Sequence, residues 1–187
     1  MEEVATNFRD QAPSARELIE QAEEEGSFTR PENRVPLEYR PTPTEARVPA
    51  WKHGVEAARQ LRAEQGLDGQ PIKTPELAEM YGVSEEVVVR ETPKKTMAFE
   101  LLGEDGGGQG RVVLRSDFRE GRRFELARLL GDSLLQVAPE RLHPSTRTYS
   151  YRQQMQRAFA GEFLCPIESL QDVLGGDTSD DAQRKAM

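Results

Sequence analysis

Apolar residues recur every three or four positions in several stretches, which is the spacing of a helix with one buried face. Residues 50–66 show this spacing at Trp51, Val55, Ala58 and Leu61. Further helices are predicted at residues 14–25, 74–81, 121–136, 149–164 and 167–174. Because the helix at 121–136 carries apolar residues on two neighbouring faces, it is predicted to be the central core helix.

Three stretches favour extended structure. Residues 84–92 contain a β-branched valine run, and residues 96–103 and 110–116 also have the composition of strands. The glycine-rich segment at 103–110 lacks the Gly-Lys-Ser/Thr of a phosphate-binding loop and is interpreted as a hairpin connection. Since the strands are grouped between helices, we expect an α+β fold with a small antiparallel three-stranded sheet packed against helices.

The first 49 residues have a different pattern. Residues 1–12 carry few apolar side chains and are expected to fray, while Ser14 can cap the short helix that follows. Residues 27–49 contain five prolines, which favour extended backbone. Both a disordered tether and an arm docked on the domain remain open. The expected organisation is an arm at 1–49, one domain at 50–175 and a polar tail at 176–187.

Composition and charge narrow the class of protein. The chain has 187 residues, a formal net charge of −8 and 36% hydrophobic residues, which fits one domain with a modest core. An acidic chain makes direct nucleic-acid binding improbable, because such binders carry a basic face. No apolar run reaches the ~18–20 residues of a membrane span, and the N-terminus does not resemble a secretory signal. One cysteine excludes an internal disulfide and a four-cysteine zinc site, so a cytoplasmic protein is expected.

Four segments, in order, carry a resemblance to a known family. They are ARQLRAEQGLDGQPIKTPELAEMYGVS (58–84), RVVLRS (111–116), GRRFELARLLGDSLL (121–135) and RAFAGEFLCPIESL (157–170). Over about residues 50–175 the chain resembles the ImmA/IrrE family of bacterial metallopeptidases, which share the IrrE N-terminal-like domain. The resemblance implies a zincin-like core helix. In the family this helix carries His-Glu-x-x-His, whose histidines bind zinc and whose glutamate activates the metal-bound water. A glutamate of the next helix is the third ligand.

This chain departs from the family pattern at each of those positions. Aligning the Arg-Phe pair at 123–124 and the Phe-Ala pair at 159–160 with the family places other residues there: Arg128, Leu129, Asp132 and Gln153. A guanidinium has no lone pair for a metal, and a leucine cannot accept a proton. A single carboxylate beside Arg128 is a poor zinc site. We therefore expect no catalytic residue, no metal ligand set and no zinc, although zinc is the family's cofactor.

The replaced positions allow two interpretations. Arg128 and Asp132 lie four residues apart on a helix and can pair, and Gln153 can add an amide hydrogen bond, so the three can fill the former metal cavity. Alternatively, the two charges lie in a solvated cleft and contribute ~0–1 kcal/mol. Both interpretations stay open at the level of sequence.

Other candidate residues have simple structural interpretations. His53 is expected at the surface, His143 in a loop without a metal partner, and Cys165 as a small buried apolar group. Ser133 has no evident base beside it. Glu125 and Glu162 are expected to be surface charges on helices. Arg119, Arg122 and Arg123 form a basic cluster that is expected to be solvated, although an acidic partner is an alternative.

The sequence supports three functions from different classes. The favoured one is a non-catalytic, regulatory or protein-binding module whose partner, by the resemblance, is a helix-turn-helix regulator. A zinc-dependent endopeptidase with atypical ligands, Asp132 with a distant group such as His143, is the first alternative. A structural subunit of an assembly is the second. Residues 76–88 superficially resemble a helix-turn-helix, but the valine run that ends them suits a strand better. Members of the family often carry further helices after the last resembling segment, so the resemblance implies that this chain is truncated at its C-terminus.

Overall fold

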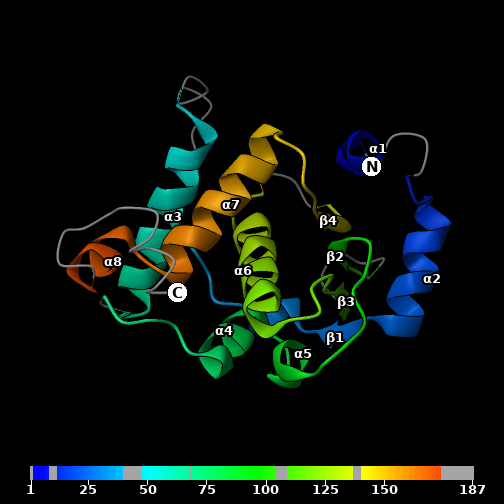
Figure 1. Ribbon diagram of the computed structural model, residues 1–187, viewed down its shortest axis with the longest axis horizontal. Helices are drawn as coiled ribbons and strands as arrows, with labels where there is room; N and C mark the ends of the chain where they lie inside the picture. The colour runs from blue at the N-terminus through cyan, green and yellow to red at the C-terminus, as the bar shows by residue number, and fades with distance from the viewer. Residues whose placement is uncertain are drawn as a thin grey trace.

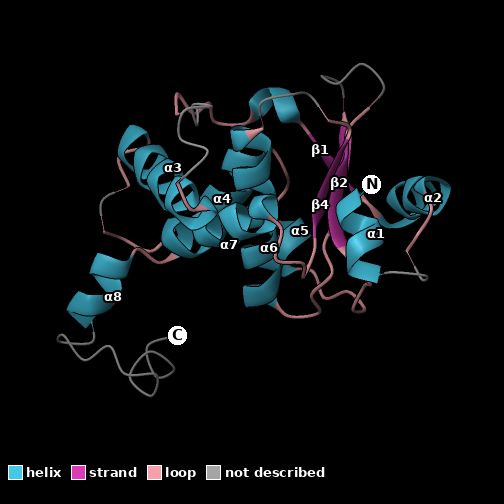
Figure 2. Cartoon of the chain, turned by 90° about the horizontal axis from the view of Figure 1, so that it is seen from above, coloured by secondary structure: helices cyan, strands magenta, loops and turns pink. Residues whose placement is uncertain are grey.

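The elements form three layers in a computed structural model that describes residues 2–8, 12–39, 48–67, 69–103, 109–136 and 140–173. A four-stranded sheet lies between a large helical layer and a small one (Figures 1 and 2). The large layer contains α3 (Ala50–Glu64), α4 (Thr74–Tyr81), α5 (Glu86–Val89), α6 (Arg119–Leu135) and α7 (Tyr151–Leu164), and α8 (Ile167–Val173) follows α7. The small layer contains α1 (Glu2–Phe8) and α2 (Ala15–Glu25). The α+β class is confirmed.

The sheet has one more strand than the sequence pattern predicts. Its strands are β1 (Ser27–Thr29), β2 (Ala98–Leu101), β3 (Gly110–Val113) and β4 (Leu142–Ser145). The order is β1-β3-β2-β4, with every pair antiparallel. The predicted strands at 96–103 and 110–116 are confirmed as β2 and β3. Both edge strands were missed, because each is very short and one contains a proline.

Alternation along β3 supplies a separate core for each face of the sheet. Val112 and Leu114 belong to the main core with α6, whereas Val113 belongs to a second core. In that second core Phe99 of β2 and Val113 pack with Leu18 and Ala22 of α2. Successive strand residues point to opposite faces, so one short strand serves both layers.

The strand predicted at 84–92 is wrong. Residues Glu86–Val89 form the short helix α5 instead, and Val87 and Val88 are buried in the main core. Ser84 starts this turn, because its carbonyl accepts from Val87 N at 3.0 Å and its hydroxyl accepts from Glu86 N at 3.4 Å. The β preference of valine is overridden here because packing against α6 buries the same side chains in a helical turn.

The N-terminal segment is part of the folded unit. β1 pairs with β3, and Leu37 is 3% exposed in the main core. Arg34 forms a buried ion pair with Glu100 of β2 and donates to the Tyr81 carbonyl at 3.0 Å. The docked-arm interpretation of residues 27–49 therefore describes residues 27–39, which pack on elements that lie beyond residue 50. The Pro-rich stretch at 40–47 lies outside the described residues, as does the expected polar tail at 176–187.

Helix capping follows the sequence in this segment. The Ser14 hydroxyl accepts from Glu17 N, and the Glu17 carboxylate accepts from Ser14 N, which is a complete capping box. α1 forms where fraying was expected, and Val4 of α1 is fully buried in the second core. One buried apolar residue does not make a repeating pattern, so the sequence did not predict this helix.

The long helices α3 and α7 approach each other closely at Gly54. A Cβ added at Gly54 would lie 2.3 Å from the Met155 carbonyl oxygen and 2.8 Å from Phe159 N. These are backbone atoms of α7, which cannot rotate away as a side chain can. Gly161, on α7, has open space around its own Cβ position.

Two glycine substitutions test this packing. Gly54→Ala is expected to lower the free energy of unfolding by about 1–3 kcal/mol or more, because the helices must separate. The matched control, Gly161→Ala, is expected to raise it by about 0.5–1 kcal/mol through helix propensity. Denaturant unfolding of both variants measures the difference. Equal effects of the two substitutions would contradict the close approach.

Candidate functional site

Arg128, Asp132 and Gln153, three of the four candidate site residues, lie where α6, α7 and β4 come together. Asp132 is 1% exposed, Gln153 is fully buried and Arg128 is 7% exposed. Asp132 and Arg128 lie one turn apart on α6, and Gln153 lies near the start of α7. The solvated-cleft interpretation of the two charges is therefore wrong, since both side chains are buried.

Asp132 is held by partners that the sequence analysis did not assign to it. Arg152 of α7 binds it with two parallel hydrogen bonds, Nε to Oδ1 at 2.7 Å and Nη2 to Oδ2 at 2.6 Å. His143 of β4 lies 2.9 Å away, from Nδ1 to Oδ2. Arg152 also pairs with Glu140 at 2.7 Å. The expected pairing of Asp132 with Arg128 is not formed.

The charge of Asp132 is stabilised by this arrangement. Burial opposes ionisation, but the hydrogen bonds from Arg152 and His143 outweigh it and lower the pKa of Asp132 to about 2. The reciprocal effect acts on Arg152: burial opposes its charge, but the bonds to Asp132 raise its pKa above the ordinary value. The carboxylate is thus a fixed anion that links α6 to α7 and β4.

Arg128 uses the amide side chains of α7 instead. Its Nη2 donates to the Gln153 Oε1, to the Thr146 carbonyl at 2.8 Å and to the Gln156 Oε1 at 3.3 Å. Burial, and then the nearby charge of Arg157, lower the pKa of Arg128 to about 10. Of the three residues expected to fill one cavity, Arg128 and Gln153 bind each other, whereas Asp132 binds Arg152 and His143.

The same two glutamines form hydrogen bonds with backbone groups at the end of β4. Gln153 Nε2 and Gln156 Nε2 both donate to the Pro144 carbonyl, at 2.9 and 3.1 Å. The Gln153 Oε1 accepts from Thr146 N at 2.8 Å. A peptide that bound by adding a strand at this edge would need those backbone groups. Side chains of the protein already occupy them.

Leu129, the fourth candidate site residue, is fully buried in the main core. It contributes an apolar contact and no proton-transfer group. A carboxylate there would be buried among apolar neighbours, at a large desolvation cost.

These residues do not fit a zinc ion. Both oxygens of Asp132 are already engaged by Arg152 and His143, and Arg128 presents only donors. Within the described ranges, no three His, Cys, Asp or Glu side chains gather as a metal-ligand group. No reaction step can be built on a metal held by these side chains.

Several other expectations are corrected by burial. His53 is 3% exposed and lies 2.6 Å from the Tyr39 hydroxyl through Nδ1, so it is not a surface histidine. His143 lies on β4 and contacts Asp132, so it is not an isolated loop residue. Cys165 is exposed rather than buried, because it is the cap residue that follows α7. Ser133 donates to the Leu130 carbonyl on its own helix.

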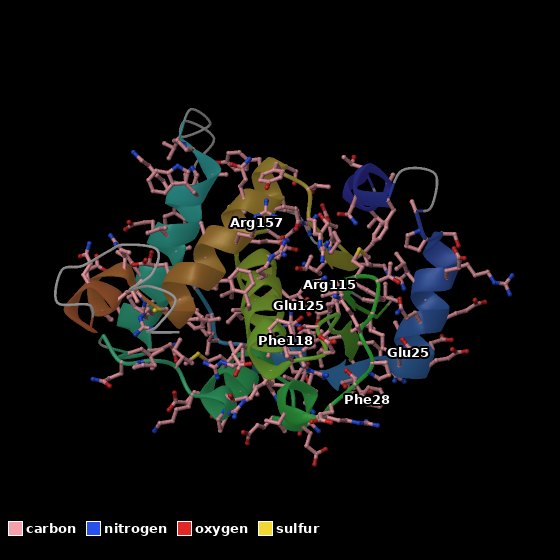
Figure 3. The ribbon with its side chains drawn as sticks, viewed as in Figure 1. Glu25, Phe28, Arg115, Phe118, Glu125 and Arg157 are labelled. Carbon is pink, nitrogen blue, oxygen red and sulfur yellow. The ribbon has the colours of Figure 1, made fainter. Side chains whose placement is uncertain are left out.

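Glu125 and Glu162 are not solvated helix charges. Glu125 is 4% exposed and accepts from the backbone N–H groups of Arg115 and Ser116, at 2.8 and 3.0 Å. Arg115 also binds it through Nε at 3.1 Å, and Figure 3 shows this pair beside α6. Glu162 pairs with Arg59 of α3 at 2.7 Å.

The arginines at the start of α6 are engaged in contacts with α4 and α5. Arg122 is 5% exposed and donates to the Val87 carbonyl of α5 and to Thr92. Arg123 and Arg119 both donate to the Thr74 hydroxyl, and Arg123 also reaches the Ile72 carbonyl. These arginines tie α4 and α5 to α6; the expectation of a solvated cluster is wrong for the buried Arg122, whereas Arg119 is exposed.

The segment at 76–88 does not complete a helix-turn-helix. α4 ends at Gly82 in the left-handed conformation, at φ 82°, but α5 is only 4 residues long. Arg122 caps α5 through the Val87 carbonyl and Val88 is fully buried. A recognition helix needs an exposed face that reaches bases in the major groove.

Sequence reasoning missed Arg152 and Gln156 as members of the site, and it named His143 only as a distant zinc ligand to act with Asp132, not as a hydrogen-bond partner of its carboxylate. Two signals were available. His143 precedes a proline, which favours extended backbone and an edge strand. Gln153 and Gln156 lie three residues apart beside the apolar Met155 and Phe159, which places two amides on the buried face of α7.

Comparison of the chain with protein-family models, with curated proteins and with solved structures gave no match. Among the described helices, none has the length and apolar character needed to cross a bilayer.

The ion pair at Asp132 predicts how stability depends on pH. The pKa of Asp132 is about 2 in the folded protein against 3.8 for a free side chain. The unfolded chain therefore takes up the proton first as the pH falls. The contribution of Asp132, about 2 kcal/mol, is complete above about pH 4 and is lost between about pH 4 and pH 2.

Asp132→Asn is the variant that isolates this term. It is expected to lower the free energy of unfolding at pH 7 by about 3 kcal/mol, since the partly buried Arg152 loses its two charge-assisted bonds to the carboxylate and keeps its pair with Glu140. It is also expected to flatten the loss of stability between pH 4 and pH 2. Denaturant unfolding across that range, with the exposed Glu20→Gln as control, measures both effects. An unchanged acid slope in Asp132→Asn would contradict the assignment.

Proposed function

We propose that the chain is a non-catalytic, metallopeptidase-like module that acts in the cytoplasm by binding a protein partner. The observation that carries the proposal is the bidentate Arg152–Asp132 pair, which uses the carboxylate that a metal would need. The buried Leu129 and the Arg128–Gln153 bond support the same conclusion, because neither position offers a base or a metal ligand.

The membership in the ImmA/IrrE family on which this proposal draws rests on the segment resemblance alone. It supplies the candidate partner class, a helix-turn-helix regulator. The order of elements is compatible with such a frame, since a central helix, α6, is followed by an edge strand and by a second helix, α7.

An exposed aromatic surface supports a role in protein binding. Trp51 near the start of α3 is 51% exposed, and Tyr149 and Tyr151 at the start of α7 are 85% and 49% exposed. The Tyr151 hydroxyl donates to the Val48 carbonyl at 3.4 Å, which places these two helix starts beside each other. Tyrosine and tryptophan are the residues that most often anchor protein interfaces.

Zinc binding tests the non-catalytic half of the proposal. The purified chain is expected to contain substoichiometric zinc and to give no saturable heat in a zinc titration by calorimetry. Because Cys165 is an exposed thiol, which can bind zinc loosely, the matched sample is Cys165→Ser. One equivalent of tightly bound zinc in Cys165→Ser would overturn the proposal and favour a peptidase with atypical ligands.

Partner binding tests the other half. In a titration with a purified helix-turn-helix regulator, Trp51→Ala combined with Tyr149→Ala is expected to weaken binding tenfold or more, since such side chains act as hot spots. Ile19→Ala, on the exposed side of α2, serves as control and is expected to leave the affinity unchanged. Equal affinities for all three proteins would contradict the aromatic surface.

A further inference from the structure

A cavity of about 510 Å³ opens beside Arg128, on the side of α6 that faces the sheet. Its walls come from the C-terminal end of α1, the segment before β2, the end of β3, α6 and the end of β4. The volume lies within the range of small-molecule sites, about 300–1,000 Å³.

The charge of this cavity is opposite to the charge of the chain. Five cationic side chains line it: Lys94, Lys95, Arg115, Arg128 and Arg147. Among the described lining residues one carboxylate, Glu125, faces them, and it is already bound by Arg115 and two backbone N–H groups. Lys95 is paired with Glu25 at 2.7 Å. In a chain with a net charge of −8, this is a local concentration of positive charge.

Two buried side chains in the cavity wall have hydrogen-bonding capacity that the protein does not use. Arg128 Nε and Ser145 Oγ are buried and have no partner among the described residues. Arg128 donates its hydrogen bonds to Thr146, Gln153 and Gln156 through Nη2. Arg128 is 7% and Ser145 5% exposed, so neither donor is compensated by bulk water. An unpaired buried donor costs about 1–3 kcal/mol, which a bound acceptor would recover.

We propose that this cavity binds the phosphate group of a small phosphorylated molecule. The Arg128 guanidinium and the Ser145 hydroxyl are the inner donors, and Lys94 and Arg147 at the exposed rim neutralise the remaining charge. A phosphate monoester fits this donor set better than a carboxylate does. It carries up to two negative charges and three terminal oxygens, so it can meet a guanidinium, a hydroxyl and a rim cation at once.

Both unpartnered atoms belong to residues that line the cavity, Arg128 of α6 and Ser145 at the end of β4. The backbone around it is already held, because the Pro144 carbonyl accepts from Gln153 and Gln156. The glutamines that close the former metal cleft thereby hold one wall of the anion site in place.

The test is a calorimetric titration of the full chain with inorganic phosphate and with ribose 5-phosphate at constant ionic strength. Saturable binding of one equivalent of each is expected. Ser145→Ala is the sharpest variant, because its hydroxyl has no protein partner to lose. It is expected to unfold like the parent chain and to bind both probes about fivefold more weakly.

A charge-matched pair of variants tests the rim. Lys94→Gln combined with Arg147→Gln is expected to weaken both probes about tenfold or more. The control, Arg16→Gln combined with Lys52→Gln, removes the same charge from exposed side chains that do not line the cavity. It is expected to bind like the parent. Absent saturable binding, or equal affinities for the parent, Ser145→Ala and both double variants, would overturn the proposal.

This inference rests on the proposed function at one point, since Arg128 serves as a binding residue in a site without zinc. The two can fail separately. Tight zinc in Cys165→Ser overturns the non-catalytic proposal whatever phosphate does. Zinc-free protein that binds neither probe overturns the anion site and leaves the non-catalytic proposal intact.

Discussion

A carboxylate with 1% of its surface exposed is unstable in a protein interior unless partners replace the water that it has lost, and Asp132 is such a group. Its two oxygens require donors from outside its own helix, and they find them on α7 and β4. The partners of this one charge therefore join three elements. Arg152, near the start of α7, and His143, on the edge strand β4, both reach Asp132 of α6. The Gln153 and Gln156 contacts to Pro144 and Thr146 follow from this placement, because the three elements are already together.

This constraint also decides what the site can do. A carboxylate committed to a bidentate arginine pair has no oxygen left for a metal, and the arginine one turn before it supplies only donors. The neighbouring Leu129 completes the main core instead of carrying a base. The bonds of Asp132 to Arg152 and His143 thus join α6 to α7 and β4. A cavity lined by basic side chains lies on the sheet side of Arg128.

The sequence predicted the long helices because each repeats apolar residues at helical spacing over several turns, whereas α1 and α5 are too short for such a pattern. It predicted β2 and β3 from their strand-like composition. The valine run at 87–89 failed because local β preference is weaker than burial against α6. β1 and β4 were missed because 3 and 4 residues are too few for a pattern. At the site, Arg128, Asp132 and Gln153 were placed together by the resemblance, but their partners were not. An ion pair between residues 132 and 152 leaves no mark at helical spacing, and only the meeting of α6 with α7 creates it.

The central claim is that Asp132 and Arg152 stabilise each other inside the fold. A double-mutant cycle tests it most directly, with Asp132→Asn, Arg152→Gln and the double variant compared with the parent in denaturant unfolding at pH 7. The expected coupling free energy is at least about 1.5 kcal/mol, with the double variant more stable than the sum of the single losses implies. Additivity of the two losses to within about 0.5 kcal/mol would contradict the mutual stabilisation of Asp132 and Arg152, and the carboxylate of Asp132 could then bind a metal.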